Sequence, residues 1–287
     1  MNILFIGSSS SLSLIPITTL ITSEYSVCAV ATNDINNTIF NAINTGTIQS
    51  LAFDNAIPII NLNENIVTVL DQIIHYQPDV IITSCYPHKI PDSILSLAKM
   101  GAYNLHPSLL PLFRGPSPLF WQFREGVDEF GVTLHRMSPE FDQGDIVAQK
   151  IVKMNDGVSI NAATSLMADI GGQLILEFLD NLSKNNINEQ AQDESISSYQ
   201  SFPTMDDYTV SALWNAKRIY DFINAYKENN VFFLCDIDGR NFKLVDALSY
   251  QNGTYAEMAC EQYKVTGDII FFACRTGFIQ CRIKLDD

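Results

Sequence analysis

Asp79-Val80-Ile81-Ile82 and Ala102-Tyr103-Asn104-Leu105 decide the fold of this chain. Each stretch has the pattern of a short buried strand, and a short helical pattern at residues 94–97 lies between them. A strand, a helix and a second strand in this order favour parallel pairing, because the helix carries the chain back across the sheet. The middle of the sequence therefore predicts a βαβ unit.

The same alternation continues toward the N-terminus and extends the predicted sheet. Pro16 argues against the first half of one helix, since proline has no amide hydrogen to donate. Gly7 stands alone after the first strand, so the three-glycine pattern of a dinucleotide site is missing and such a site is disfavoured. We predict an α/β fold with a doubly wound, mostly parallel sheet. Its N-terminal strands are expected at residues 3–6, 27–31 and 58–60, with helices at 12–21 and 66–76 and a polar loop from 32 to 47.

Toward the C-terminus the pattern changes to strands at residues 130–137 and 146–152, then a long helix at 162–182. A polar stretch rich in Asn, Gln and Ser follows, and we predict a linker there. Short strands with turns over residues 231–285 indicate a small OB-like β-barrel. The predicted division is a first domain at 1–182, a linker at 183–205 and a C-terminal domain at 206–287. The latter is expected to open with a helix at 210–226, whose apolar face would comprise Leu213, Ile219, Phe222 and Ile223.

Composition limits the classes of function. The chain has 287 residues, 47% of them apolar and 17% charged, which suits a folded protein with a sizeable core. Its net charge is -15 and no Lys or Arg precedes Lys89, so the first 88 residues offer no cationic groove for nucleic acid. The N-terminus lacks the positive region of a signal peptide, and no apolar run reaches the length of a membrane span. We therefore expect a cytoplasmic protein without a membrane partner.

Metal chemistry is also disfavoured by the sequence. The six cysteines are scattered without a Cys-x-x-Cys pair, and the four histidines are dispersed as well. We expect free thiols and no metal site.

Asn104 and His106 are the candidate catalytic pair. They lie two residues apart at the end of a predicted strand, so both side chains face the same side of the sheet, at the edge where open α/β sheets bind ligands. An amide and an imidazole suit acyl transfer to an amine, because the first stabilises negative charge on oxygen and the second accepts a proton. Asp142 would either hold a water or orient the imidazole and favour its charged form. By themselves, however, an Asn-x-His pair is more often structural, and an Asp before Gly more often forms a turn.

The surrounding residues resemble the 10-formyltetrahydrofolate-dependent formyltransferases. That family carries Asn-x-His, then Ser-Leu-Leu-Pro, Arg-Gly and an Asp-x-Gly turn. The matching residues are Asn104 and His106, Ser108-Leu109-Leu110-Pro111, Arg114-Gly115, and Asp142-Gln143-Gly144, with further matches at Pro78-Asp79-Val80-Ile81-Ile82 and Gly131-Val132-Thr133-Leu134-His135-Arg136-Met137. The similarity is densest over residues 78–149. It extends more thinly over the rest of the chain, including a C-terminal barrel like that of methionyl-tRNA formyltransferase.

The resemblance implies that Asn104, His106 and Asp142 are the catalytic residues and that 10-formyltetrahydrofolate is the co-substrate. It places the pterin ring between a loop at residues 84–91, with Ile90 as an apolar wall, and a second loop at 138–142. Pro87 departs from the family pattern because it removes an amide donor from the first loop. His88 is either a second base or an exposed loop residue. The implied cofactor contacts are Ser84, Cys85, Tyr86, His88, Ile90, Glu140 and Asp142.

The resemblance leaves the amine acceptor open. We favour a small-molecule amine such as a nucleotide-linked amino sugar, with Ser108 and Arg114 as substrate contacts. Arg114 would pair with a phosphate or else fix its loop. Methionyl-tRNA is disfavoured, since residues from 202 onward hold nine Lys and Arg against twelve Asp and Glu. Phe120, Trp121 and Phe123 would stack on the acceptor or, more simply, pack in the core.

Three other activities stay open. A modified ornithine could accept the formyl group, or water could take the place of the amine in a formyltetrahydrofolate hydrolase. A non-catalytic binding protein is the remaining class, which retention of the three polar residues argues against. The oligomeric state and the role of the C-terminal barrel are not fixed by the sequence.

Overall fold

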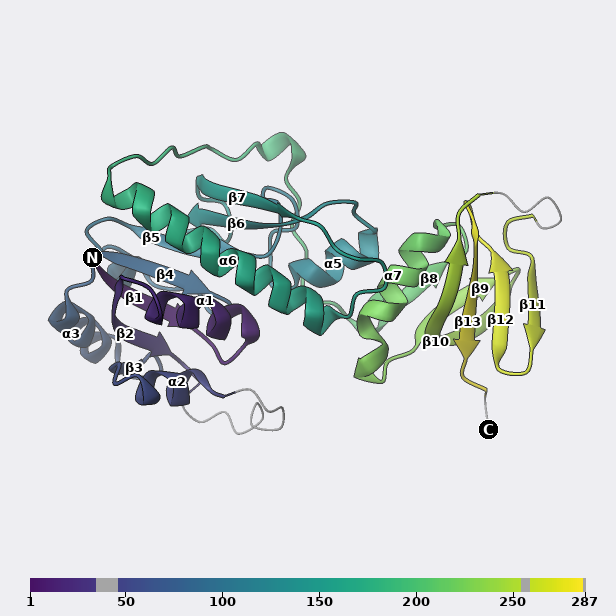
Figure 1. Cartoon of the computed structure of the whole chain (residues 1–287), viewed down its shortest axis with the longest axis horizontal. Coiled ribbons are helices and arrows are strands. Elements are labelled where there is room, and N and C mark those ends of the chain that lie inside the picture. Colours follow the sequence, from purple (N-terminus) through teal and green to yellow (C-terminus); the bar gives the residue numbers. More distant parts are fainter. Residues whose placement is uncertain (35–45, 254–258, 286–287) are drawn as a thin grey trace. The chain divides into compact units, whose positions relative to one another are not determined.

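A seven-stranded sheet forms the centre of the first of two compact units, which comprises residues 1–116, 131–152 and 164–200 (Figure 1). The structure is a computed structural model that describes residues 1–34, 46–253 and 259–285. Most of the polar loop predicted at 32–47 lies outside these residues. The strands of the sheet are β1 (Asn2–Gly7), β2 (Ser26–Thr32), β3 (Ile59–Asn61), β4 (Val80–Ser84), β5 (Ala102–His106), β6 (Phe130–Arg136) and β7 (Ile146–Val152).

The strand order is β3-β2-β1-β4-β5-β6-β7. The pairs from β3 through β5 are parallel, whereas β6 runs antiparallel to β5. The prediction of a mostly parallel sheet is therefore confirmed. The reversal at β6 places His135 opposite Asn104, which contributes to the site described below.

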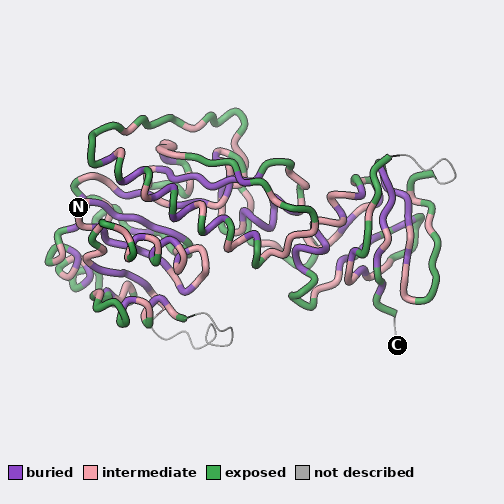
Figure 2. Tube along the Cα trace, viewed as in Figure 1, coloured by how far each residue is buried: buried purple, intermediate pink, exposed green. Residues whose placement is uncertain are grey.

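Helices cover both faces of this sheet, as a doubly wound fold requires. One face packs α3 (Ile66–Tyr76) and the short α4 (Asp92–Leu95) over Leu4, Ile81 and Ala102. On the other face, Tyr103 of β5 contacts Phe178 of α6 (Ile160–Ser183), its ring centroid 4.5 Å away. Central strands such as β1 and β4 are buried along their length (Figure 2). The remaining helices of this part of the chain are α1 (Ser11–Ile21) and α2 (Ile48–Asp54).

Pro16 lies inside α1 rather than preventing it. A proline at this position has no amide hydrogen for the carbonyl of Leu12, one turn earlier. The hydroxyl of Ser84 donates to that carbonyl instead. The objection from sequence was therefore wrong because a side chain from another strand replaces the missing bond.

A mostly antiparallel six-stranded sheet forms the second unit, which comprises residues 117–130, 153–163 and 201–287. Its order is β11-β12-β13-β10-β9-β8, and β8 pairs with β9 in parallel. The predicted second domain of short β-strands is therefore confirmed, and within the described residues β11 and β8 are the two edges of its sheet. Its elements are α5 (Pro118–Glu125), β8 (Thr209–Ser211), α7 (Ala216–Tyr226), β9 (Phe233–Ile237), β10 (Arg240–Gln251), β11 (Tyr263–Thr266), β12 (Ile269–Ala273) and β13 (Phe278–Ile283).

The start of α7 corrects the sequence prediction of a helix over 210–226. Residues 209–211 form β8, and the helix begins at Ala216 after Asn215, whose side chain caps it by accepting from the Arg218 amide. Leu213 therefore lies outside the helix and is 57% exposed, whereas the other three residues of the predicted face are buried. The capping preference of Asn was the missed signal.

The aromatic residues of α5 are core residues of the second unit. Phe120 packs edge-to-face against Tyr208, Phe222 and Tyr226, with ring centroids 5.1 to 5.5 Å apart. Phe123 contacts Phe130. Trp121 is buried and donates its indole N–H to the carbonyl of Ser201. Of the two roles that the sequence allowed for these side chains, the structure therefore has them in core packing.

Residues 189–200 do not form a free linker. They pair with the first unit through β-bridges from Gln190 to Ile146 and from Tyr199 to Arg114. The functional division at residues 182 and 205 stays a prediction, because the two units describe packing and not activity. No helix among the described residues is long and apolar enough to cross a membrane.

Candidate active site

Asn104 and His106 lie at the carboxyl end of β5, with both side chains on the face that packs α3 and α4. The antiparallel register sets His135 of β6 directly opposite Asn104. The Asn104 amide nitrogen is 3.1 Å from Nε2 of His135. The adjacent strands β5 and β6 therefore bring the side chains of Asn104, His106 and His135 close together.

Asp142 completes this cluster from the loop between β6 and β7. Its carboxylate Oδ1 lies 3.5 Å from His106 Nδ1 and 3.6 Å from His135 Nε2, and its side chain is 11% exposed. The other oxygen accepts the amide hydrogen of Gly115 at 2.9 Å. Asp142 has a left-handed backbone, with φ of 57°, which the loop must hold in place. We call Asn104, His106, His135 and Asp142 the polar cluster.

Neighbouring carbonyl groups fix the hydrogen positions on both imidazoles. A carbonyl oxygen only accepts, so Nε2 of His106 carries the hydrogen that it donates to Phe113 O, at 2.9 Å. In neutral His106 the free lone pair is then on Nδ1, which faces Asp142. In the same way Nδ1 of His135 donates to the carbonyl of Arg136, which leaves Nε2 to accept from Asn104.

Burial lowers the pKa of His106 below its ordinary value, although the carboxylate of Asp142 acts in the opposite direction. The imidazole is therefore neutral at physiological pH and able to accept a proton. Burial also opposes ionisation of Asp142. The positive charge that His106 carries once it is protonated at low pH and the hydrogen bond from the Gly115 amide outweigh this effect, so the pKa of Asp142 lies below its usual value. The cluster thus combines an ionised carboxylate with a neutral base.

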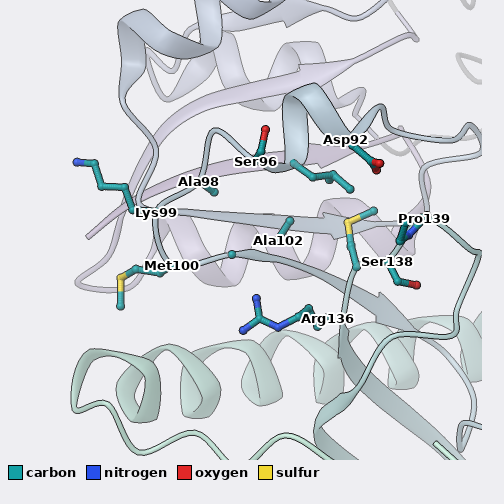
Figure 3. A pocket seen from close by; sticks show the side chains of 12 residues that line it. Asp92, Ser96, Ala98, Lys99, Met100, Ala102, Arg136, Ser138 and Pro139 are labelled. Atoms are coloured by element: carbon teal, nitrogen blue, oxygen red, sulfur yellow. The ribbon is translucent and has the colours of Figure 1, made fainter. Parts of the chain in front are cut away.

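A pocket of about 480 Å³ lies between α4, the start of β5 and the segment after β6 (Figure 3). Ala102 and Met137 are on its wall, and each lies two residues from a cluster member on the same strand path, Asn104 or His135. Side chains two apart on a strand share a face, so these wall residues lie on the same face of the sheet as Asn104 and His135. The pocket has the size of a small-ligand site. Its other lining residues are Asp92, Leu95, Ser96, Ala98, Lys99, Met100, Gly101, Arg136, Ser138 and Pro139.

The predicted cofactor contacts are not among the residues that line this pocket, and their role stays a prediction. Ser84 is buried and its hydroxyl bonds to Leu12, while Ile90 belongs to the core cluster under α3 and α4. Cys85, His88 and Glu140 are exposed, and the Tyr86 ring packs edge-on against His88. The pocket is instead lined by α4 and the segment before β5. The sequence analysis placed the site at the carboxyl ends of strands, and this rule alone did not predict the residues that line the pocket.

The side chains of Ser108 and Arg114 both form hydrogen bonds with other residues of the protein. The Ser108 hydroxyl is fully buried and donates to the carbonyl of Leu112. The Arg114 guanidinium is 4% exposed and is paired with Gln192 and Glu194. Of the two roles that the sequence gave Arg114, the structure has it in the loop-fixing one.

His135 is the residue of this cluster that sequence reasoning missed. The strand pattern could have identified it, because antiparallel pairing of residues 130–136 with β5 places His135 opposite Asn104. The reversal of β6 was not predicted, so that register was not considered. Among the described residues, no group of three or more His, Cys, Asp or Glu side chains is arranged to hold a metal ion.

Comparison with known proteins identifies related chains. The methionyl-tRNA formyltransferase of Thermotoga maritima is 33% identical over 150 residues, which are 52% of this chain and 48% of that protein. The methionyl-tRNA formyltransferase of Limosilactobacillus fermentum is 32% identical over 203 residues, 69% of this chain and 63% of that protein. The matches thus span roughly half to under two thirds of these curated relatives.

Solved structures share the fold over nearly the whole chain. An N-formyltransferase from Helicobacter canadensis, in complex with folinic acid and dTDP-3-aminofucose, superposes with a TM-score of 0.73 at 17% identity, covering 99% of both chains. WlaRD, a sugar 3N-formyl transferase solved with dTDP and 5-N-formyl-THF, gives a TM-score of 0.71 at 18% identity, covering 100% of this chain and 98% of that one.

The family model described as formyl transferase matches residues 1–179, which include β1 to β7, the pocket and every member of the polar cluster. Because that match covers well over half of the sequence, the chain belongs to the formyl transferase family.

Proposed function

We propose that this protein transfers the formyl group of 10-formyltetrahydrofolate to an amine, with Asn104, His106 and Asp142 as catalytic residues. The observation that carries the proposal is the convergence of these three side chains around His135 and His106, on the face of the sheet that also bears a ligand-sized pocket. Membership of the formyl transferase family supports the reaction class. Structures of the same fold with folinic acid or 5-N-formyl-THF support a folate co-substrate.

Each polar group has one part in this chemistry. An amine that attacks the formyl carbon forms a C–N bond, the bond from that carbon to N10 breaks, and the amine loses a proton. His106 takes that proton on Nδ1, the nitrogen left free by its bond to Phe113, and passes it to N10. Asp142 faces that nitrogen and stabilises the charged imidazole. The second amide hydrogen of Asn104 stabilises the charge that develops on the formyl oxygen.

The pocket suits the pterin ring of the folate. Apolar side chains of Leu95, Ala102 and Met137 can contact the faces of a flat ring, while Asp92 and Lys99 offer groups of both charges to its polar edge. Ser138 belongs both to this pocket and to the loop predicted to close over the pterin. The residues present therefore fit the co-substrate.

A small-molecule amine, such as an amino sugar on a nucleotide, is the acceptor we favour. The two superposed structures support this choice, since they are sugar-type N-formyltransferases covered over nearly their full length. The acidic balance of residues 202–287 also favours it over an RNA substrate. Methionyl-tRNA is the second candidate, because the curated relatives at about 30% identity are methionyl-tRNA formyltransferases. We further propose that residues 1–182 are the catalytic domain; the cytoplasmic location stays a prediction.

An acceptor screen tests the proposal. The full chain is incubated with 10-formyltetrahydrofolate and one of four acceptors: a nucleotide-linked amino sugar, hydroxyornithine, methionyl-tRNA or buffer alone. We expect folate release that depends on the amino sugar, together with a formylated product by mass spectrometry. Formylation of the charged tRNA would overturn the acceptor, folate release in buffer would indicate a hydrolase, and no release with any acceptor would overturn the reaction.

Ala102→Leu tests the pocket separately. The added side chain fills the wall beside Asn104, so the KM for the folate should rise by about tenfold, which corresponds to about 1.4 kcal/mol of binding. Ala168→Leu is the control, because Ala168 is also a buried alanine but lies on α6 and does not line the pocket. An unchanged folate KM in Ala102→Leu would remove the pterin from this pocket and leave the polar cluster untouched.

A further inference from the structure

The segment of residues 189–200 holds the loops of the polar cluster; we call it the clasp. It follows α6, where the sequence predicted a linker. Glu189 pairs with Arg136, and the backbone of Gln190 exchanges two hydrogen bonds with Ile146. Farther along, Ser198 accepts from the amide of Arg114 and Gln200 donates to its carbonyl. The clasp therefore spans from the end of β6 to the loop after β5.

Gln192 is the central residue of the clasp. Its amide nitrogen donates to the carbonyl oxygens of Asp142 and Gly144, each at 2.8 Å. Its amide oxygen accepts from Nε and Nη2 of Arg114, at 3.1 and 2.8 Å. One side chain thus ties the Asp142 turn to the segment that contains Arg114.

Arg114 links Gln192 to the rest of the polar cluster through the residues on either side of it. Its buried guanidinium is held by Glu194 through two bonds, at 2.7 and 3.0 Å. The residue before it, Phe113, accepts from His106, and the residue after it, Gly115, donates to the Asp142 carboxylate. A movement of this segment would therefore displace both the imidazole and the carboxylate.

A glutamine is required by this arrangement for a chemical reason. The position must donate two hydrogens to carbonyl oxygens on one side and accept from a cation on the other. A glutamate could accept from Arg114 but has no hydrogen to offer the turn. The turn also needs support, because Asp142 has a left-handed backbone that a non-glycine residue adopts at an energetic cost.

We propose that Gln192 is a positioning residue for formyl transfer, which sets the Asp142 carboxylate against His106 through the turn at residues 142–144. This inference rests on the proposed function. Gln192 acts through Asp142 and does not touch the reacting atoms.

The test compares Gln192→Ala and Gln192→Glu with Asp193→Asn. Asp193 is the neighbouring exposed residue and bonds only within the described clasp, to Ser195. We expect both Gln192 variants to lower kcat by about 10- to 100-fold, the scale of a displacement of about 1 Å at a catalytic group. Asp193→Asn should stay within about twofold of the parent protein, since exposed substitutions change little.

Gln192→Glu distinguishes a role of Gln192 in positioning Asp142 from a role in the stability of the fold. It keeps the buried charge of Arg114 paired, so it should fold even if Gln192→Ala does not. Near-normal kcat in folded Gln192→Glu would overturn the proposal, because the two bonds to the turn would then be dispensable.

The pH profile gives a second readout that a stability defect would not move. Withdrawal of the carboxylate from His106 lowers the pKa of the imidazole, since Asp142 normally raises it. The acidic limb of kcat/KM should therefore move to lower pH in Gln192→Ala, which adds no charge, as it should in Asp142→Asn. An unmoved limb with reduced amplitude would overturn the proposal. Inactivity of the parent protein would instead contradict the proposed function.

Discussion

Asn104 donates a hydrogen bond to His135 across the β5–β6 pair, at 3.1 Å between its amide nitrogen and Nε2. Nε2 can accept because the other ring nitrogen donates to the carbonyl of Arg136. The bond fixes which end of the Asn104 amide is nitrogen and where its second hydrogen points. His135 therefore orients the group that we propose stabilises the formyl oxygen.

A double-mutant cycle measures this relationship. Asn104→Ala should lower kcat by about 10²- to 10³-fold, the usual loss for one donor to a developing oxyanion. His135→Ala should lower it by about tenfold, because Asn104 remains but loses its fixed orientation. In the double variant the loss should equal that of Asn104→Ala alone. Additive losses would mean that His135 acts independently of Asn104, and Asn229→Ala, an exposed substitution in the second unit, serves as the control.

The dependence of activity on pH follows from the pKa of His106. Burial lowers that pKa, and a base must be neutral to accept a proton. Activity should therefore stay constant as pH falls to the ordinary histidine pKa of about 6.5, and decline only at lower pH. In Asp142→Asn the decline should occur at still lower pH, with kcat at least about a hundredfold below the parent. A profile of kcat/KM from about pH 5 to pH 8 checks both effects; a limb above the ordinary histidine pKa would contradict the assignment of His106 as base.

Gly115→Ala should destabilise the loop beside Asp142. Gly115 has φ of +108°, and an added Cβ would lie 2.1 Å from the carbonyl oxygen of Gln200. Gly253 is a matched control, since its φ is +107° and no heavy atom of the described residues lies within 4 Å of an added Cβ. Both variants bear the backbone strain, so the difference isolates the contact with the clasp.

We expect Gly115→Ala to lower the unfolding midpoint in urea and nearly abolish turnover, whereas Gly253→Ala should retain turnover. Equal effects of the two substitutions on the unfolding midpoint would show that the close approach of Gln200 to Gly115 does not affect stability.

Phe222 and Leu213 test the corrected boundary of α7. Phe222 is fully buried against Phe120, Tyr226 and Phe233, so Phe222→Ala should lower the free energy of unfolding of the second unit by about 3 to 5 kcal/mol. Leu213 is 57% exposed and precedes the helix. Leu213→Ala should change stability by no more than about 0.5 kcal/mol. Denaturant unfolding measures both, and a large loss in Leu213→Ala would restore the original helix prediction.

The elements with regular patterns were predictable from sequence. Ile66–Tyr76 and Ile146–Val152 were predicted at their observed bounds, because apolar spacing follows the helix and strand periods. The parallel sheet and the Asn104–His106 pair follow from the same periodicity.

The features that were missed depend on contacts distant in sequence. Pro16 is tolerated because Ser84 reaches Leu12 from another strand. His135 joins the cluster because β6 reverses direction, and Gln192 because a polar segment returns to the sheet. Polar composition indicates exposure or loop structure, but it does not specify which buried cation or carbonyl the segment will bind.

The path of the chain around α5 bears on how this protein can be shortened. Residues 117–130 belong to the second unit, although the stretches before and after them belong to the first. Leu119, Phe120 and Phe123 are buried there, with Phe120 against α7. A fragment that ended near residue 205 would retain α5 but lack the partners of its aromatic side chains. Such a fragment would expose the apolar side chains of α5 to water and aggregate. The function of this protein is therefore better studied by point substitution than by truncation.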